Sequence, residues 1–395
     1  MKPRILINAS TLVVGGGIQV GISFVEFASQ GYSTDFEFMF AVSKGIYDGL
    51  PLERQQDSRV KLVRNSPARI VSGHESRRLL KELEKEFRPD LVYSLGSPSY
   101  TRFRTMEIGR YTNPWEIFAD LPWSCLPFKD KIYFWLSARY RLLWVRNVAY
   151  FETQTEAAKA AIVKRLGVPE NRVKVIPNAP NPVFCSPGPR DNQDAGKKQA
   201  TVFCLAAPYR HKNLVIIPRV AAILKRRDPS HSYSFVLTIP PGGELDREIR
   251  EKARRLGVGD MIANVGLLKM RECISWYENC DVVFLPTLLE VFSATHVEAM
   301  AMMKPIVTTD RDFCRSVCGD AALYFDPQSA EAAAGAIMAV VNDEHLRRDL
   351  VQRGKRRIET FPSPKKKHDM VFEWLLEIAH QQKGVVSPMP LEAQG

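Results

Sequence analysis

The stretch DVVFLPTLLEVFSATHVEAMAMMKPIVT, residues 281–308, carries a strand, helix and strand pattern that identifies the fold class. Asp281–Leu285 is a short apolar run that predicts a buried strand. The apolar and small residues of Ala294–Met302 predict a helix, and Pro305–Thr308 predicts a second strand. A strand, a crossover helix and another strand form the βαβ unit of a parallel sheet. This stretch therefore predicts an α/β fold.

The same alternation extends over the rest of the chain on both sides of this stretch. In the second half, strands are predicted at Thr201–Leu205, Tyr233–Ile239 and Met261–Val265, and helices at Leu214–Arg227, Asp246–Leu256 and Met270–Asn279. In the first half, strands are predicted at Arg4–Asn8, Phe36–Val42, Leu91–Leu95, Val148–Phe151 and Val173–Ile176, and helices at Ile18–Ser29, Glu75–Phe87 and Glu156–Leu166. Such alternation is typical of mostly parallel sheets that are covered on both faces.

The segment PNAPNPVFCSPGPRDNQDAGKKQ, residues 177–199, interrupts the pattern with Pro, Gly, Asn and charged residues. We therefore predict two Rossmann-like, doubly wound domains that face a cleft, over residues 1–186 and 200–362, with a linker at 187–199. A helix over 363–383 and a disordered tail over 384–395 follow.

Composition limits the function classes. Hydrophobic residues make up 45% and charged residues 25% of the 395 residues, as in a folded globular protein of two domains. No apolar run is long enough to span a bilayer, and the N-terminus lacks the apolar core of a secretory signal. The seven cysteines form no CxxC pair, which favours reduced thiols in the cytoplasm. The net charge of +11 favours an anionic partner without identifying it.

The loop and helix within 281–308 carry groups suited to a phosphorylated sugar. Glu290 lies in the loop before the helix, and Glu298 lies about one and a half turns into it. Ser293 is a candidate N-cap, where free amides and the helix dipole favour a phosphate. Carboxylates are strong acceptors for sugar and ribose hydroxyl groups. The segment therefore suits a sugar diphosphate, which has hydroxyl groups at both ends and charge in the middle.

This segment resembles the E-x7-E motif of the retaining glycosyltransferases called group 1, or family 4. The resemblance implies that Glu290 contacts the donor sugar and Glu298 the nucleotide ribose. It also implies that the backbone around Val291, Phe292 and Ser293 faces the sugar and the diphosphate. The family usually has Gly beside the Phe, and here Val291 and Ser293 stand there.

A second match lies in TVFCLAAPYRHKNL, residues 201–214. Lys212 and Asn213 align with the Lys-Asn pair of the family, in which an Arg and a Lys bind the diphosphate. The family's Arg usually lies five residues before that Lys, where this chain has Ala207, so Arg210 is the substitute that we expect. By the same resemblance Leu267 belongs to the donor site.

Two weaker matches lie in the first domain. The glycine-rich turn GGG, residues 15–17, follows the first strand, so Gly16 and Gly17 resemble the family's loop near the donor phosphates. VKVIPNAPNPVF, residues 173–184, resembles the end of the family's first domain. The resemblance implies the GT-B fold, in which the C-terminal helix, here Lys365–Gln381, returns to the first domain.

The reaction implied is sugar transfer from a UDP- or GDP-linked donor to an acceptor hydroxyl, with retention at the anomeric carbon. Lys212, Arg210 and the Ser293 helix end would stabilise the leaving diphosphate, beside the catalytic Glu290. The resemblance implies no cofactor and no essential metal, and Cys314 and Cys318 lack further ligands beside them.

The acceptor is less well defined. The first-domain pattern looks like bacterial surface-polysaccharide transferases of O-antigen and lipopolysaccharide assembly, which implies a glycan or lipid-linked glycan acceptor. KDKIYFWLSARYRLLWVR, residues 129–146, is equally consistent with a helix on an anionic membrane and with a partly buried helix. The first alternative places the protein at the cytoplasmic face of the inner membrane.

Two other functions remain open at this stage. A sugar-nucleotide epimerase shares the two-domain plan but needs further acid and base residues. A basic α/β protein that binds nucleic acid is disfavoured because no recognised nucleic-acid module occurs, so we expect no nucleic-acid partner.

Overall fold

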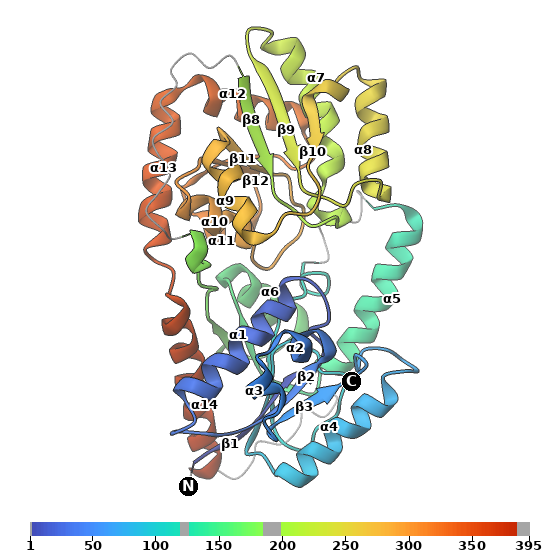
Figure 1. Ribbon diagram of the computed structural model, residues 1–395, viewed down its shortest axis with the longest axis vertical. Coiled ribbons are helices and arrows are strands. Elements are labelled where there is room, and N and C mark those ends of the chain that lie inside the picture. The colour runs from blue at the N-terminus through green and yellow to red at the C-terminus, as the bar shows by residue number, and fades with distance from the viewer. Residues whose placement is uncertain (1, 119–125, 185–198, 385–395) are drawn as a thin grey trace. The chain divides into compact units, whose positions relative to one another are not determined.

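The computed structural model describes residues 2–118, 126–184 and 199–384. The chain forms two compact units (Figure 1). The first comprises Met1–Ile117, Ile132–Pro177 and Lys365–Gly395, and the second comprises Phe118–Lys131 and Asn178–Pro364. The predicted linker and tail lie, apart from Gln199 and Gly384, outside the described residues.

The first unit contains a parallel sheet of seven strands in the order β3-β2-β1-β4-β5-β6-β7. The strands are β1 (Arg4–Ala9), β2 (Glu37–Ser43), β3 (Val60–Val63), β4 (Leu91–Ser94), β5 (Glu107–Arg110), β6 (Val148–Thr153) and β7 (Val173–Val175). The helices are α1 (Gly16–Gly31), α2 (Lys44–Gly49), α3 (Leu52–Gln55), α4 (His74–Phe87), α5 (Phe128–Val145, in this unit from Ile132), α6 (Glu156–Leu166) and α14 (Pro364–Gly384).

Helix α14 packs into the core of the first unit, although the second unit separates it from that core in the sequence. Phe372 and Leu375 of α14 are buried in the same cluster as Phe24 of α1 and Phe38 of β2. The rings of Phe24 and Phe372 have centroids 5.3 Å apart. Helix α4 packs in a separate cluster with Leu6 of β1. The predicted return of the C-terminal helix to the first domain is therefore confirmed.

The second unit contains a parallel sheet of six strands in the order β10-β9-β8-β11-β12-β13. The strands are β8 (Gln199–Cys204), β9 (Ser232–Leu237), β10 (Ile262–Asn264), β11 (Val282–Leu285), β12 (Ile306–Thr309) and β13 (Ala322–Phe325). The α-helices are α7 (Ile217–Arg227), α8 (Glu244–Arg255), α9 (Met270–Asn279), α10 (Ala294–Ala301), α11 (Asp312–Cys318), α12 (Ala330–Asn342) and α13 (Glu344–Ile358).

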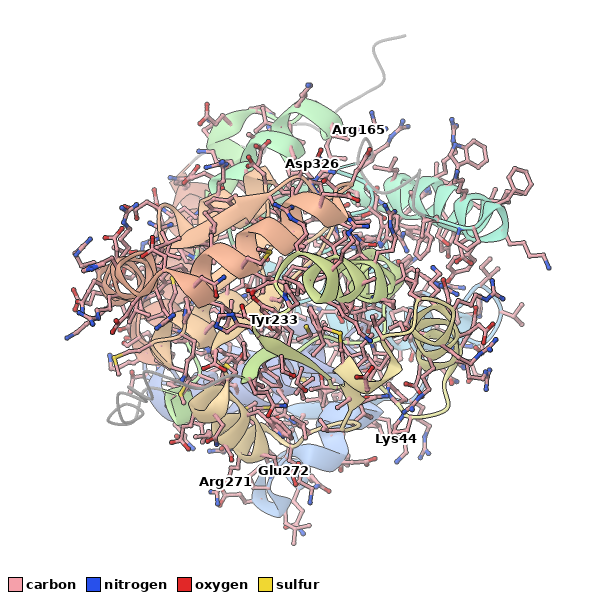
Figure 2. The ribbon with its side chains drawn as sticks, turned by 90° about the horizontal axis from the view of Figure 1, so that it is seen from above. Lys44, Arg165, Tyr233, Arg271, Glu272 and Asp326 are labelled. Atoms are coloured by element: carbon pink, nitrogen blue, oxygen red, sulfur yellow. The ribbon has the colours of Figure 1, made fainter. Side chains whose placement is uncertain are left out.

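Helices cover both faces of the second sheet, as the alternation of buried side chains along its strands requires. Val282 of β11 belongs to one core cluster, with α7, α8 and α12. Its neighbour Val283 belongs to a second cluster, with α9, α10 and α11. Figure 2 labels Tyr233 of β9, which is fully buried, and Glu272 of α9, which caps the exposed start of that helix.

The order of strands in each sheet reverses at one place. In the second unit this place lies between β8 and β11, which pair side by side while their connections leave in opposite directions. In the first unit it lies between β1 and β4. Loops at the carboxyl ends of such strands diverge and leave room for a ligand. This topology therefore directs attention to the loops that follow β8 and β11.

Candidate donor-sugar site

The loops after β8 and β11 are joined by hydrogen bonds. The loop after β8 forms two short 3-10 turns, η4 (Arg210–Lys212) and η5 (Leu214–Ile216), with Asn213 between them. Asn213 has a positive φ of 54°, a conformation that Asn tolerates better than most residues. The backbone N–H of Leu288 donates to the carbonyl oxygen of His211 over 2.8 Å. These contacts place Lys212 opposite the second loop.

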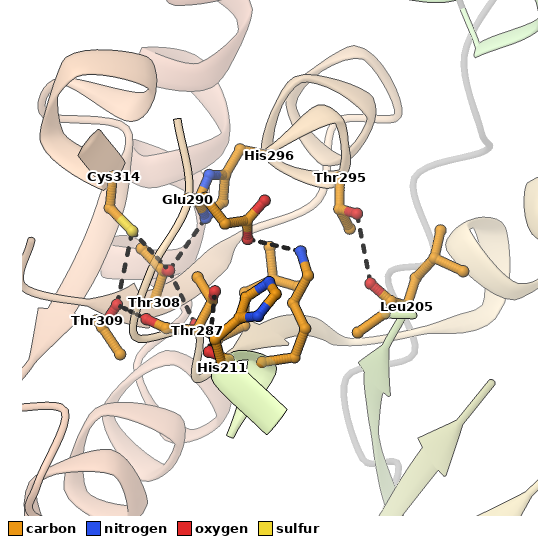
Figure 3. Close-up of polar contacts among 12 residues, drawn as sticks. Leu205, His211, Thr287, Glu290, Thr295, His296, Thr308, Thr309 and Cys314 are labelled. Atoms are coloured by element: carbon orange, nitrogen blue, oxygen red, sulfur yellow. Dashed lines mark hydrogen bonds and ion pairs between the residues drawn. The ribbon is translucent and has the colours of Figure 1, made fainter. Parts of the chain in front are cut away.

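Lys212 and Glu290 form an ion pair at the centre of the site (Figure 3). Nζ of Lys212 lies 2.6 Å from Oε1 of Glu290, and the two side chains are only 14% and 10% exposed. Burial alone would raise the pKa of Glu290, but the adjacent ammonium of Lys212 outweighs it and lowers that pKa. The carboxylate therefore remains charged. A buried pair of this kind contributes little to stability by itself but is costly to break on one side.

Two histidines, half-buried His211 and fully buried His296, flank this pair and stay neutral. Burial and the nearby positive charge of Lys212 lower the pKa of His211 to about 4. Burial also lowers the pKa of His296 to about 4, although Glu290 opposes that shift. Nε2 of His296 lies 3.0 Å from Oγ1 of Thr308, whose hydroxyl donates to the carbonyl oxygen of Leu285. His296 therefore donates through Nε2, and the imidazole adds no competing charge.

Helix α10 starts next to the ion pair. Ser293 occupies the N-cap position, as predicted, but its side chain makes no capping hydrogen bond. Thr295, in the first turn, donates to the carbonyl oxygen of Leu205 over 3.3 Å, which ties the helix start to the end of β8. Backbone N–H groups at a helix start and the positive end of its dipole favour an anion.

Glu298 is held one turn further along α10. The hydroxyl of Tyr277 donates to Oε2 of Glu298 over 2.9 Å. Burial raises the pKa of Glu298 in spite of this hydrogen bond. Of the two predicted carboxylates, Glu290 lies next to the ammonium of Lys212, and Glu298 accepts a hydrogen bond from the hydroxyl of Tyr277.

The remaining predicted donor residues lie in different surroundings. Arg210 pairs with Glu248 and, over 2.6 Å, with Glu244 of α8, so its side chain does not join Lys212 and Glu290. Val291 is buried, and the Phe292 ring packs edge-on against Phe361 with centroids 6.2 Å apart. Leu267 is 69% exposed in the loop after β10.

The glycine-rich turn belongs to the first unit and precedes α1. Gly15 is the N-cap with a φ of 57°, and Gly16 and Gly17 open the helix. A Cβ atom added at Gly16 would meet no other atom within 4 Å, whereas one added at Gly17 would lie 3.4 Å from the side chain of Leu12. The turn follows β1 at the place where the order of the first sheet reverses.

Sequence patterns did not reveal His211, His296 and Thr308. His296 stands inside the quoted stretch, but a histidine on an apolar helix face carries no signal of its own. Its proximity to Glu290 and Thr308 arises only when β11, α10 and β12 pack together.

The site combines an ammonium group and a helix N-terminus with two carboxylates, which suits a ligand with both phosphate and hydroxyl groups. Among the described residues, no cluster of His, Cys, Asp and Glu could hold a metal ion. In the same part of the chain, no helix is both long enough and apolar enough to cross a bilayer.

Known proteins resemble the chain in sequence and in structure. It is 22% identical over 223 residues to D-inositol 3-phosphate glycosyltransferase of Paenarthrobacter aurescens, covering 55% of each chain. It is 23% identical over 253 residues to O-antigen chain mannosyltransferase RfbU of Salmonella typhimurium, covering 63% of this chain and 65% of that one. The matched regions thus span between half and two thirds of these relatives.

The structure of Anabaena HepE in complex with UDP superposes with a TM-score of 0.70 at 16% identity, covering 95% of this chain and all of the other. The two parallel-sheet units are those of GT-B glycosyltransferases, which confirms the predicted fold class. Residues 189–357 match the family model of group 1 glycosyl transferases. The second α/β unit, with Lys212, Glu290 and Glu298, is therefore a group 1 glycosyl transferase domain.

Proposed function

We propose that this protein is a glycosyltransferase that moves a sugar from a nucleoside-diphosphate sugar to an acceptor hydroxyl, with retention at the anomeric carbon. The observation that carries the proposal is the buried pair of Lys212 and Glu290, 2.6 Å apart, in the loops after β8 and β11. The start of α10 provides a second anion-binding element beside it.

The residues divide into roles along such a donor. Glu290 accepts from sugar hydroxyl groups, and Glu298 accepts from the ribose of the nucleotide. Lys212 and the backbone of Val291, Phe292 and Ser293 bind the diphosphate. The resemblance to group 1 enzymes divides the roles between Glu290 and Glu298, and charge is consistent with it, because carboxylates accept from hydroxyl groups while ammonium and amide groups donate to phosphate.

The other predicted residues support this arrangement from its edges. Asn213 fixes the turn that carries Lys212, and Leu267 borders the nucleotide. Gly16 and Gly17 open α1 of the first unit, and their approach to the donor phosphates stays a prediction. Arg210 would have to leave Glu244 and Glu248 to reach the diphosphate, so we assign it a weaker role than Lys212.

Departure of the nucleoside diphosphate builds negative charge on the leaving oxygen. Lys212 and the N-terminal amides of α10 stabilise this charge, which is the largest single contribution in many enzymes. The histidines remain neutral near neutral pH, so they compete neither with Lys212 for the phosphates nor with the donor for Glu290. In this proposal neither a metal nor a cofactor takes part.

The HepE complex with UDP supports a UDP-linked donor, and a GDP-linked donor fits the same site. The acceptor that we propose is a lipid-linked glycan of bacterial surface polysaccharide assembly. This part draws support from the resemblance to O-antigen chain mannosyltransferase RfbU. The protein would then work at the cytoplasmic face of the inner membrane, through peripheral contact.

Binding of UDP-, GDP- and dTDP-sugars to the purified full-length protein tests the donor site. We expect saturable binding of one donor class and at least a tenfold loss of affinity in Lys212→Met, since a charged contact to phosphate is lost. Glu290→Gln should lose affinity for the nucleotide sugar but not for the free nucleoside diphosphate.

The control is an exposed pair in the first unit. Lys44→Met and Asp48→Asn remove an ion pair of similar length, 2.7 Å, from α2 and should leave donor affinity unchanged. The proposal fails if no sugar nucleotide binds. It fails equally if both variants of the buried pair bind like the wild type.

A further inference from the structure

The first unit contains a basic pocket that the donor site does not use. Its volume is about 580 Å³, and its walls come from α4, from the loop after β4 and from the end of α5. Five basic side chains and one carboxylate line it: Arg77, Arg78, Lys81, Lys85, Arg102 and Glu82. The pocket therefore carries a strong positive charge.

This charge is poorly neutralised within the protein. Arg78 pairs with Glu82 over 2.9 Å. Arg77 donates to the carbonyl oxygens of the loop before α4, so no carboxylate offsets its charge. In the described part of the chain, Lys81 and Lys85 form no ion pair. Lysines four residues apart repel each other along a helix, and an anion in the pocket would relieve that repulsion.

Aromatic rings form the other wall of the pocket. Tyr100 is 8% exposed and stacks on Tyr140 of α5, with ring centroids 5.6 Å apart. The guanidinium of Arg102 lies 5.7 Å from the centre of the Trp144 ring. Tyr100 has a φ of 56°, a costly conformation for an aromatic residue that is typical of binding sites. The wall is thus partly apolar and aromatic, unlike a simple phosphate site.

An exposed apolar stripe runs along α5 beside this pocket. Ile132, Leu136 and Leu143 are 46%, 55% and 59% exposed and share one face of the helix. Trp144 follows Leu143 and therefore points about a quarter turn further around the helix, toward the pocket. Arg139, in the same stripe, covers the exposed ring of Trp135 at 4.5 Å. Apolar, aromatic and basic side chains together are typical of a surface that meets a bilayer.

We propose that this pocket binds the phosphate headgroup of an anionic phospholipid while the α5 stripe rests on the bilayer. The inference rests on the membrane contact in the proposed function and adds a specific headgroup site to it. The basic residues match the charge of the headgroup, and the tyrosine and tryptophan match the interface between headgroups and acyl chains.

Sedimentation of the full-length protein with lipid vesicles tests this. The vesicles are phosphatidylcholine alone or phosphatidylcholine mixed with phosphatidylglycerol. The test variant is Lys81→Gln/Lys85→Gln, and its matched control is Lys355→Gln/Arg356→Gln, which removes the same charge from exposed positions on α13. We expect the test variant to bind mixed vesicles about tenfold or more weakly than the control.

The outcomes separate the pocket from the membrane contact itself. If the wild type binds both kinds of vesicle equally, or neither, membrane recognition through anionic lipid is wrong. If the wild type prefers mixed vesicles but the test variant matches the control, membrane contact stands and the pocket assignment is wrong. Displacement from vesicles by inorganic phosphate at constant ionic strength would show that the pocket takes a soluble anion, which also overturns the lipid assignment. Donor binding, measured in parallel, reports on the second unit alone.

Discussion

At the scale of single residues, His296 makes the stability of the fold depend on pH. Its side chain is fully buried and its pKa is lowered to about 4, so the folded protein holds it neutral. In the unfolded chain a histidine takes up a proton below about pH 6.5. Between these values the unfolded state binds more protons, so stability is fully present above that range and falls as the pH decreases through it.

We expect His296→Gln to reduce this loss, because Gln can still donate to Thr308 but does not titrate. One pKa unit corresponds to about 1.4 kcal/mol, so His296 accounts for about 3 kcal/mol of the decrease. Urea unfolding at a series of pH values measures it. His345→Gln, at an exposed position on α13, is the control and should leave the slope of the wild type unchanged. An unchanged slope in His296→Gln would refute the assignment.

Sequence motifs indicate some single residues of the site, whereas contacts that arise from packing alone carry no signal in the sequence. Lys212 and Glu290 come from separate segments with recognisable patterns, and the structure places them in contact. Arg210 is the predicted substitute for the family's Arg because it lies, like Lys212, just past the end of the strand. The structure pairs its side chain with Glu244 and Glu248, two acidic residues one helical turn apart on α8. Nothing in a linear pattern indicates which carboxylates a folded loop will meet.

At the scale of elements, the turn around Asn213 determines where Lys212 points. Its φ of 54° is available to Gly and tolerated by Asn, but it is strained for a β-branched residue. Asn213→Gly should therefore keep both stability and donor affinity. Asn213→Val should cost about 1–2 kcal/mol of stability and also weaken donor binding, because the turn must rearrange. Urea unfolding and donor titration measure the two effects.

Met303 supplies the matched control for that turn. It has the same φ of 54° but follows the far end of α10. Met303→Val should lose a similar amount of stability while donor affinity stays the same. Equal losses of affinity in both valine variants would mean that strain anywhere in the unit weakens binding, and the special role of Asn213 would be wrong.

Helices with a clear hydrophobic period were predicted closely, whereas three of the short strands were missed. Helices α6 (Glu156–Leu166) and α9 (Met270–Asn279) have the predicted bounds. Strands β3, β5 and β13 were not predicted. Charged residues interrupt the apolar run in β3 (VKLV) and β5 (EIGR), and such short strands gain their identity from neighbours in the sheet. The predicted helix from Leu214 begins instead as a 3-10 turn, η5, and becomes α7 at Ile217, just before Pro218. The 3-10 turn η4, which precedes η5, carries Lys212 of the site. Such irregular turns are harder to predict from sequence than the regular helix that follows them.

At the scale of the whole molecule, the chain builds two separate sets of cores. Those of the first unit include residues from both ends of the chain, since Ile5 of β1 and Leu375 of α14 belong to one cluster. Those of the second unit are built from buried residues from Phe184 onward, such as Ile337 of α12. No residue is shared between these clusters. Each unit has its own buried apolar surface and can therefore respond separately to a change in its core.

This separation predicts two responses in calorimetry. Leu375→Ala, at a fully buried position of α14, should lower the unfolding temperature of the first unit at a cost of about 2–5 kcal/mol, because it leaves a cavity. Ile337→Ala, equally buried in α12, should lower that of the second unit instead. A saturating donor nucleotide binds the second unit in our proposal, so it should raise only the transition that Ile337→Ala lowers. If the donor raises the transition that Leu375→Ala lowers and leaves the other unchanged, the nucleotide is held by the first unit, and the assignment of Lys212 and Glu290 to the donor is wrong.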